Sequence, residues 1–297
     1  MLLILDNGRP LRGDLVVSAV VRYDLAPVPA TLEAEIRLDA DMEARLATDK
    51  TIALANGDVM RIIKSVRASG RAAQGQRENA TMRITALLDA CHQVTFVRAR
   101  AIIKENTPLS GLYRAAGASL RAVDADFPVQ RFYCLAGDTP SYQIARVLQE
   151  EGGAVRWKNG RLQFLRLQDF FDQKPVMNLP GNASDDTDSG FLERHEVPTF
   201  FSIRDDATLV YGNRDKPRTV RFAPHKNELK LRNMTRVLVH RKVSKIALNA
   251  KLAAGDVVQF AGGDKLLVVT AAHVFQSGTD GAGVNTYSRL WLSSLEE

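Results

Sequence analysis

The chain has 297 residues, of which 45% are hydrophobic and 25% are charged, so it is long enough for two or three domains with buried cores. This composition excludes a disordered or fibrous protein. The formal net charge of +6 and the isoelectric point near 9.4 permit an acidic partner, but a surplus this small is weak evidence of nucleic-acid binding.

The cysteines and the apolar runs bear on the cellular compartment. Cys91 and Cys134 are too few for a disulfide framework and are not spaced as zinc ligands, so we expect two buried thiols. No apolar run approaches the roughly 20 residues of a membrane-spanning helix. The N-terminus lacks the basic segment of a signal peptide and turns early, at Asn7-Gly8. We therefore expect no membrane anchor, and a chain that stays or is assembled in the cytoplasm.

Residues 1–38 predict the opening strands of a small antiparallel barrel. Strands are expected at Leu2 to Leu5, Leu15 to Tyr23 and Thr31 to Leu38. In the third of these, apolar residues alternate with charged ones, which indicates one face against a core and one face in water.

Residues 51–88 have a layout that recurs near the C-terminus. A strand at Thr51 to Leu54, a turn at Asn56-Gly57-Asp58 and strands at Met60 to Lys64 and Thr81 to Leu88 form the first copy. The second copy has strands at Val257 to Phe260, Leu266 to Val269 and Tyr287 to Leu292, with a turn at Gly262-Gly263-Asp264.

The two copies keep one spacing. Gly57 and Gly263, like Arg83 and Arg289, are 206 residues apart, and each copy has a polar loop before its last strand, at Ser69 to Asn79 and Gln276 to Asn285. The same offset extends more weakly backwards, placing Met42 over Leu248 and Leu46 over Leu252. We interpret this as two copies of one small barrel.

Between the copies the apolar period changes to that of helices. Thr107-Pro108 and Thr139-Pro140 each predict a helix start, with Thr as N-cap and Pro at the first helical position. Gly152-Gly153 is expected to end the second helix. A hairpin with its turn at Lys158-Asn159-Gly160 follows, and its apolar residues can cover that helix.

The expected fold is mainly β (α+β), with two related small antiparallel β-barrels of the SH3 or tudor kind flanking an α+β middle domain. The expected boundaries are residues 1–100 for the first barrel, 101–180 for the middle domain, and 181–297 for a linker and the second barrel. The linker is Pro180 to Gly190, and the second barrel begins at Phe191. Residues 200–225 are interrupted by Pro217 and Pro224 and receive no assigned structure.

No residues form a recognisable catalytic, cofactor or metal site. The five histidines lack metal-ligand spacing, and nucleotide-binding glycine motifs are absent. Asp185 to Glu196 partly matches a calcium loop, but hydroxyl residues replace two usual ligands, and we interpret it as a solvated acidic loop. Glu150-Glu151 are adjacent on a helix, do not face each other, and are expected to be a solvated helix end rather than an acid/base pair.

The densest basic cluster is interleaved with valines. We expect it to form a strand with one solvated face, and the alternative is a basic lining that tolerates DNA passing nearby. Its members are Arg232, Arg236, His240, Arg241, Lys242 and Lys245.

The middle of the chain carries a family resemblance. The run from Phe132 to Pro140, the helix through Ile144, Val147 and Leu148, Gly152-Gly153 and the hairpin from Trp157 to Phe164 resemble the helix-and-hairpin module of phage tail baseplate hub proteins. That family includes the late control proteins of Mu-like and P2-like phages and the VgrG hubs of type VI secretion. The resemblance implies two barrels of one type around a middle domain. The sequence ends at Glu297 soon after the last predicted strand, so we expect any spike or lysozyme activity to reside in separate chains.

The resemblance implies a structural hub of a tail baseplate or related injection machine, not an enzyme, with no cofactor. Three copies would form a ring that adapts a sixfold tail tube to a threefold spike around an axial channel. The implied partners are the tail tube or tube-initiator proteins, the central spike, the tape-measure protein, and DNA that passes without specific binding. The implied location is the virion tail baseplate, after assembly in the host cytoplasm.

Two other functions are kept as alternatives. A small-barrel nucleic-acid-binding protein needs aromatic residues interleaved with Lys and Arg on one face, whereas Phe260, Phe275 and Trp291 are expected in the core. A tail-associated cell-wall hydrolase needs paired carboxylates or a Cys/His arrangement, neither of which occurs at plausible spacing.

Overall fold

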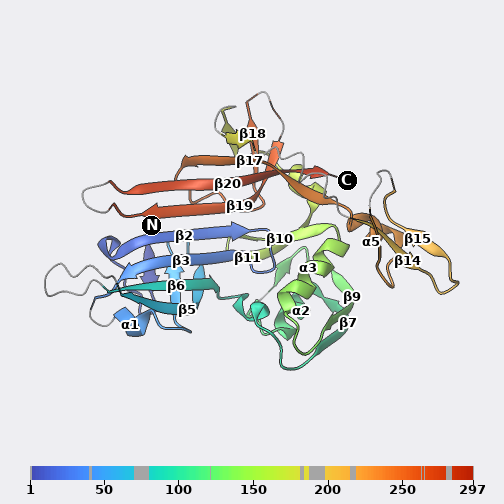
Figure 1. Ribbon diagram of the computed structural model, residues 1–297, viewed down its shortest axis with the longest axis horizontal. Helices are drawn as coiled ribbons and strands as arrows, with labels where there is room; N and C mark the ends of the chain where they lie inside the picture. The colour runs from blue at the N-terminus through green and yellow to red at the C-terminus, as the bar shows by residue number, and fades with distance from the viewer. Residues whose placement is uncertain are drawn as a thin grey trace.

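The computed structural model describes residues 2–39, 42–69, 80–120, 122–180, 184–186, 198–214, 219–261, 263, 265–278 and 283–296. Within these residues the chain is mainly β, and most strand pairs are antiparallel, which confirms the predicted fold class. One twelve-stranded sheet dominates, accompanied by three smaller sheets (Figure 1).

The first six strands form the N-terminal part of the large sheet. Their order is β1-β4-β5-β6-β3-β2. They are β1 (Leu3–Leu5), β2 (Val16–Asp24), β3 (Ala30–Arg37), β4 (Thr51–Leu54), β5 (Val59–Ser69) and β6 (Ala80–Leu88), with the one-turn helix α1 (Met42–Arg45) between β3 and β4. The alternation predicted for β3 is confirmed, because Leu32, Ala34 and Ile36 are buried.

Six later strands form the C-terminal part of the same sheet. They are β12 (Met177–Leu179), β13 (Ser184–Asp186), β17 (Val237–Ala247), β18 (Val257–Phe260), β19 (Lys265–Gln276) and β20 (Asn285–Glu296). Neighbours run β13-β17-β20-β19-β18-β12. A separate apolar core includes Val258 and Leu290 from these strands and Leu252 from the connection between β17 and β18.

Two strands from opposite ends of the sequence join these parts. β2 pairs antiparallel with β19 from Ser18–Gln276 to Asp24–Thr270. Figure 1 shows the blue β2 directly beside the red β19. The two six-stranded parts therefore share one continuous sheet.

The middle of the chain packs against this sheet. It contains a two-stranded sheet, a three-stranded sheet and three helices. The elements are β7 (Ile102–Pro108), α2 (Leu109–Ala115), β8 (Val123–Asp124), β9 (Pro128–Cys134), α3 (Pro140–Glu150), β10 (Gly153–Lys158), β11 (Arg161–Arg166) and α4 (Leu167–Phe171), and a short 3-10 helix, η2 (His92–Thr95), precedes them.

The second predicted helix and its hairpin are confirmed. α3 begins at Pro140 with Thr139 in the N-cap position, and it ends before Gly152, whose φ is +63°. Asn159 and Gly160 also have positive φ, as a two-residue hairpin turn requires. Val155, Leu162 and Phe164 share a buried core with α3.

The predicted start of the first helix is wrong by one residue. α2 begins at Leu109 with Pro108 as N-cap, and the Thr107 hydroxyl donates to the carbonyl of Glu105 instead of capping the helix. The reason is that β7 continues through Pro108, which pairs with Pro128. The pairing of β7 with β9 therefore moves the start of the helix one residue further along the chain.

The segment from Phe191 to His225 is predicted to open the second barrel, with no structure assigned to residues 200–225, and Phe191 itself lies outside the described residues. Of that segment the structure describes residues 198–214 and 219–225, and they belong to a small unit of their own. It comprises β14 (Thr199–Ile203), β15 (Leu209–Tyr211), β16 (Val220–Phe222) and α5 (Glu228–Asn233), packed around Val210, Ala223 and Leu231. Strands of three to five residues are too short to show a clear apolar period, so they could not be recognised in the sequence. This unit projects to the right of α3 in Figure 1.

Two further expectations concern the linker and the membrane. The predicted linker Pro180 to Gly190 contains β13, which pairs antiparallel with β17, while residues 181–183 and 187–190 lie outside the described residues. In the part of the chain that the structure describes, no helix is long and apolar enough to cross a membrane.

Candidate assembly surface

The two halves of the large sheet have the same strand register. In the first half Ile52 pairs with Met60, and in the second half Val258 pairs with Leu266, each partner being 206 residues further along. The longer pairs β5–β6 and β19–β20 keep this offset at every matched position. Both contain an irregularity at the same place, after Ile62 and after Val268. The predicted repeat is therefore confirmed at the level of the backbone.

The turns before the two hairpins match as well. Asp49 and Gly255 both have positive φ, of 69° and 88°. The N–H of Asp49 donates to the carbonyl of Ile62 at 2.9 Å, and that of Gly255 donates to the carbonyl of Val268 at 2.8 Å. The turn glycines Gly57 and Gly263 each donate to the end of the preceding strand, but residues 262 and 264 of the second predicted turn are outside the described residues.

The offset changes ahead of these turns. Leu46 and Leu252 are both buried, as the alignment predicts, but Met42 is buried whereas Leu248 is 38% exposed. In the first half Ala34 pairs with Ile84, and in the second Ser244 pairs with Leu290. These pairs place β17 at an offset of 210 from β3, so the connection after β17 is four residues shorter. The four additional residues of the first half form the helix α1. The weak alignment of Met42 with Leu248 is therefore wrong.

The junction between the halves is closely packed. The Thr270 hydroxyl donates to Asp24 Oδ1 at 2.5 Å, and the rings of Tyr23 and His273 meet edge to face at 6.0 Å. His273 is buried, with its two ring nitrogens 2.9 Å from Ser288 Oγ and from the Leu252 carbonyl oxygen. Burial lowers the pKa of His273, so the ring is neutral at pH 7. The junction is a fixed part of the fold.

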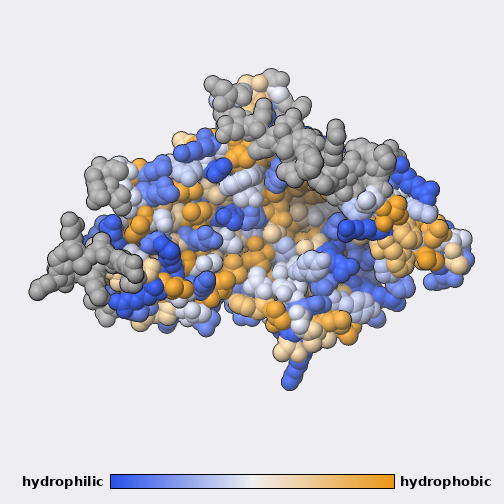
Figure 2. Space-filling view, in the orientation of Figure 1, coloured by the Kyte–Doolittle hydropathy of each residue, from blue (hydrophilic) through white to orange (hydrophobic). Residues whose placement is uncertain are grey.

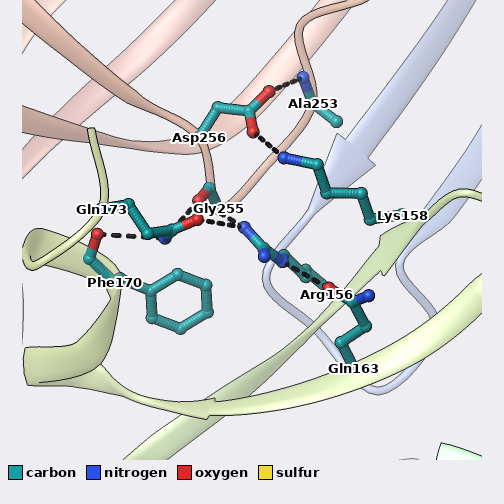
Figure 3. Close-up of polar contacts among 8 residues, drawn as sticks. All are labelled: Arg156, Lys158, Gln163, Phe170, Gln173, Ala253, Gly255 and Asp256. Carbon is teal, nitrogen blue, oxygen red and sulfur yellow. Dashed lines mark hydrogen bonds and ion pairs between the residues drawn. The ribbon is translucent and has the colours of Figure 1, made fainter. Parts of the chain in front are cut away.

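Three consecutive residues of β10 hold the middle of the chain to both halves of the sheet. Trp157 Nε1 donates to Asp58 Oδ1 in the first half at 2.7 Å. Lys158 Nζ lies 2.8 Å from Asp256 Oδ1, and an Arg156 guanidinium nitrogen donates to the carbonyl of Gly255 at 2.9 Å, both in the second half (Figure 3). We call Arg156, Trp157 and Lys158 the β10 clamp.

The clamp rests on close polar packing. Figure 3 shows Arg156 between Gln163, Gln173 and the ring of Phe170, whose centroid lies 5.7 Å from the guanidinium carbon. Burial lowers the pKa of Arg156. A Cβ on Gly255 would lie 2.6 Å from Cδ of Arg156, so only glycine permits this approach.

The role of Asp58 was not predicted from the sequence, in which this residue was interpreted only as part of a turn. Asp58 is 7% exposed and accepts hydrogen bonds from Tyr23 Oη at 2.8 Å and from Asn56 Nδ2 at 2.8 Å, in addition to the one from Trp157. Burial, followed by the Asp58 charge, raises the pKa of Tyr23. The contact joins two residues that are 99 positions apart, so no local pattern in the sequence could predict it.

The adjacent acids Glu150 and Glu151 have basic partners. Glu150 pairs with Lys226 at 2.6 Å, and Glu151 lies 3.6 Å from Lys230, so the two acids bind α5 and the segment before it instead of facing solvent. Among the described residues, no group of three His, Cys, Asp or Glu is arranged to hold a metal ion. Most of the partial calcium loop Asp185 to Glu196 lies outside the described residues. Cys91 and Cys134 are free and buried.

The basic cluster is not one strand. Arg232 lies in α5 and binds Glu228 at 2.7 Å, whereas His240, Arg241, Lys242 and Lys245 lie in β17, which is irregular between His240 and Lys242. Cations do meet aromatic rings here. Lys245 Nζ lies 4.1 Å from the Tyr287 centroid. Arg289 lies over Trp291 at 5.1 Å.

One face of the continuous sheet carries a row of basic residues across the junction. Arg22 pairs with Ala272, Ala272 with Arg289, and Arg289 with Lys245. Directly paired residues share a face, so the three basic side chains lie on one side of four adjacent strands. Figure 2 shows hydrophilic and hydrophobic residues intermixed on the visible face, without a single large apolar patch over the strands.

The small unit around β14 exposes apolar side chains. Phe201 stacks on Tyr211 with 5.8 Å between ring centroids and contacts Phe222 at 5.3 Å. The exposed apolar residues of this unit are Ile203, Leu209, Val220, Phe222 and Leu229. Exposed apolar clusters of this kind are typical of surfaces that are covered in an assembly.

No protein-family model matches the sequence, and no curated protein matches it. The fold, however, resembles solved structures along nearly its whole length. A tail protein from Neisseria meningitidis MC58 aligns with a TM-score of 0.64 and 11% identity over 99% of this chain and 95% of that chain. The prophage MuSo2 tail protein from Shewanella oneidensis aligns with a TM-score of 0.59 and 12% identity over 98% and 96%.

A third similar structure comes from a secretion system. An E. coli component of the type VI secretion system, described as structurally similar to the T4 tail proteins gp27 and gp5, aligns with a TM-score of 0.55 and 9% identity over 95% of this chain and 74% of that chain. At these identities the likeness establishes the fold. The chain therefore has the architecture found in phage tail proteins and in a type VI secretion component.

Proposed function

We propose that this chain is a structural hub of a phage tail baseplate, or of a related injection machine, in which three copies close into a ring around an axial channel. The observation that carries the proposal is the pair of sheet halves with one register, joined through β2 and β19 inside a single chain. The whole-length likeness to tail proteins supports it. The role is structural rather than enzymatic.

Symmetry gives the mechanism. Each chain supplies two equivalent halves, so three chains present six similar positions to a sixfold tail tube while remaining threefold towards a central spike. A head-to-tail contact that repeats and closes forms such a ring. The tail tube or tube-initiator proteins would then bind one side and the spike the other.

The basic row on the continuous sheet suggests which face lines the channel. Arg22, Arg289 and Lys245 lie on one face that spans both halves, and Arg83 lies on the same face beside Glu35, at 3.2 Å. A mildly positive wall favours the passage of DNA or extended cargo such as a tape-measure protein, without binding a specific sequence. The site of action would be the virion tail, after assembly in the host cytoplasm.

The mass of the assembled species tests the proposal. Native mass spectrometry of the purified full-length chain is expected to show a species of three times the 32.7 kDa chain mass. A chain that stays monomeric or dimeric across the micromolar range would overturn the ring. Obligate interfaces of this kind commonly bury more than about 2,000 Å², so the trimer should survive dilution.

A second candidate function is nonspecific binding of single-stranded nucleic acid on the same face. The cation–aromatic pairs Lys245–Tyr287 and Arg289–Trp291 favour it, although Phe260 is buried as predicted. Binding of a fluorescent oligonucleotide that weakens steeply with salt, and is lost in Arg289→Ala, would support this function. If binding is absent, or does not depend on salt, the nucleic-acid function is wrong and only the structural hub remains as the proposed function.

A further inference from the structure

The contact that joins the two halves inside the chain involves two kinds of strand edge, and among the residues that the structure describes both kinds occur a second time without a ladder partner, on β13 and on residues 64–69 of β5. β2 presents its outer edge to β19. β13 lies beside β17 as β2 lies beside β3, and β5 is the repeat of β19. Within the described residues, neither the outer edge of β13 nor that of residues 64–69 in β5 has a ladder partner.

We propose that β13 of one copy pairs antiparallel with β5 of the next copy, with Ser184 opposite Ser69, Asp185 opposite Ala68, and Asp186 opposite Arg67. The inference rests on the proposed ring and adds to it the two edges and the register that close it. The partner is a second copy of this chain.

The register follows in three steps from pairs present in the chain. Ala34 and Ser244 are equivalent, because each pairs with the matching residue of the next strand, Ile84 or Leu290. Ala34 also pairs with Ala19, and Ser244 with Ser184, which makes Ser184 the counterpart of Ala19.

The third step crosses the junction. Ala19 pairs with Phe275, and the residue 206 positions before Phe275 is Ser69. Ser184 is therefore assigned to Ser69, and the two following residues of β13 face the two preceding residues of β5. The assignment sets an acidic residue type, Asp186, against a basic one, Arg67.

Burial at equivalent positions shows what the β5 edge lacks. Ala272 is 3% exposed and His273 is 2% exposed beside β2. Their counterparts in β5 are Val66, which is 47% exposed, and Arg67, which is also exposed. The buried hydroxyl of Ser65, on the same stretch, has no hydrogen-bond partner in the described part of the chain. This part of β5 therefore matches β19 in strand position but lacks the neighbouring strand that β2 provides to β19.

A second copy fits because the chain carries both complementary edges. An open strand edge is a template for another strand, and unpaired edges are a liability unless a partner covers them. β2 and β19 show that edges of these two kinds fit together over seven paired positions. Since the two open edges differ, their contact is head to tail, and it forms a ring when the rotation closes.

Covalent capture between copies can test this register. Seven inter-strand steps of about 4.8 Å separate β5 from β13 within the sheet, so cysteines on the two strands cannot meet inside one chain. The native Cys91 and Cys134 are each 0% exposed, which keeps background cross-linking low. Directly opposed residues have Cα atoms about 4.5–5.5 Å apart, within the range of a disulfide.

The experiment compares two double variants of the full-length chain under mild oxidation. Ala68→Cys with Asp185→Cys is expected to give covalent dimers and trimers on non-reducing gels, which reducing agent returns to monomers. Lys64→Cys with Asp185→Cys is the matched control, because its residue on β5 is displaced by four positions, or about 13 Å. The expected yield of linked chains in the control is at least tenfold lower.

The outcomes separate this inference from the proposed function. Linking of the aligned pair alone supports the register. If native mass spectrometry shows a trimer but the displaced pair links as well as the aligned pair, or neither links, the register is wrong and the hub remains. A chain that never assembles overturns both.

Discussion

Trp157 Nε1 lies 2.7 Å from Asp58 Oδ1, a contact that ties a hairpin in the middle of the chain to the first half of the large sheet. Its neighbours Arg156 and Lys158 contact Gly255 and Asp256 in the second half. Because one strand contacts both halves, the β10 clamp holds their relative orientation. In the ring that we propose, two equivalent halves per chain would imitate sixfold symmetry only if that orientation is constant.

Replacing Trp157 with Phe removes the donor and leaves the buried Asp58 carboxylate with fewer partners. A hydrogen bond to a charged group contributes about 1.5–3 kcal/mol, so the free energy of unfolding is expected to fall by that order. Urea unfolding followed by circular dichroism measures it. Trp291→Phe, which changes the chain's other tryptophan, is the control and should cost less.

Gly255→Ala is expected to destabilise the protein more than Gly57→Ala. Both glycines have a φ close to +89°, so both variants incur the strain of left-handed backbone, about 1–2 kcal/mol. Only at Gly255 does the new Cβ also meet Arg156, whereas nothing lies within 4 Å at Gly57. Equal melting temperatures for the two variants would contradict the close packing of the clamp.

Acidification is expected to destabilise the second half through His273. Burial lowers its pKa in the folded state, so between that value and the unfolded pKa of about 6.5 the unfolded chain binds more protons. The contribution to stability is therefore complete above about pH 6.5 and is lost as the pH falls below it. The free energy of unfolding should decrease from pH 7 to pH 5.

The variant His273→Gln measures this effect. It should be less stable at pH 7, because its contacts with Ser288 and the Leu252 carbonyl are disturbed, but its stability should depend less on pH. An unchanged slope in His273→Gln would contradict the assignment.

Cys91 is expected to resist alkylation in the folded protein. It is 0% exposed, and burial raises the pKa of its thiol to about 12. Iodoacetamide at pH 8 should leave it unmodified until denaturant is added, as peptide mass spectrometry can show. Rapid labelling in native buffer would mean that the surrounding core opens easily.

Local patterns in the sequence determined much of the fold. The spacing of 206 residues, the turn at Gly57 and the alternation in residues 31–38 predicted repeated hairpins, and the structure confirms their register. Thr139-Pro140 and Gly152 marked the ends of α3. These features depend on neighbours within a few residues, where turn geometry and apolar period are sufficient. β5 and β19 run beyond their predicted ends at Lys64 and Val269, because the irregularity there breaks the alternation.

Only the tertiary structure decided how the halves meet. The pairing of β2 with β19, the contact of Trp157 with Asp58, the strand at Ser184–Asp186 and the small unit around β14 join residues that are distant in sequence or lie in very short strands. Hydrogen bonds between strand edges involve backbone groups that every residue carries, so side-chain patterns do not specify which edges pair. The repeat could be predicted from the sequence, whereas its continuous sheet and open edges emerge only when the chain is folded.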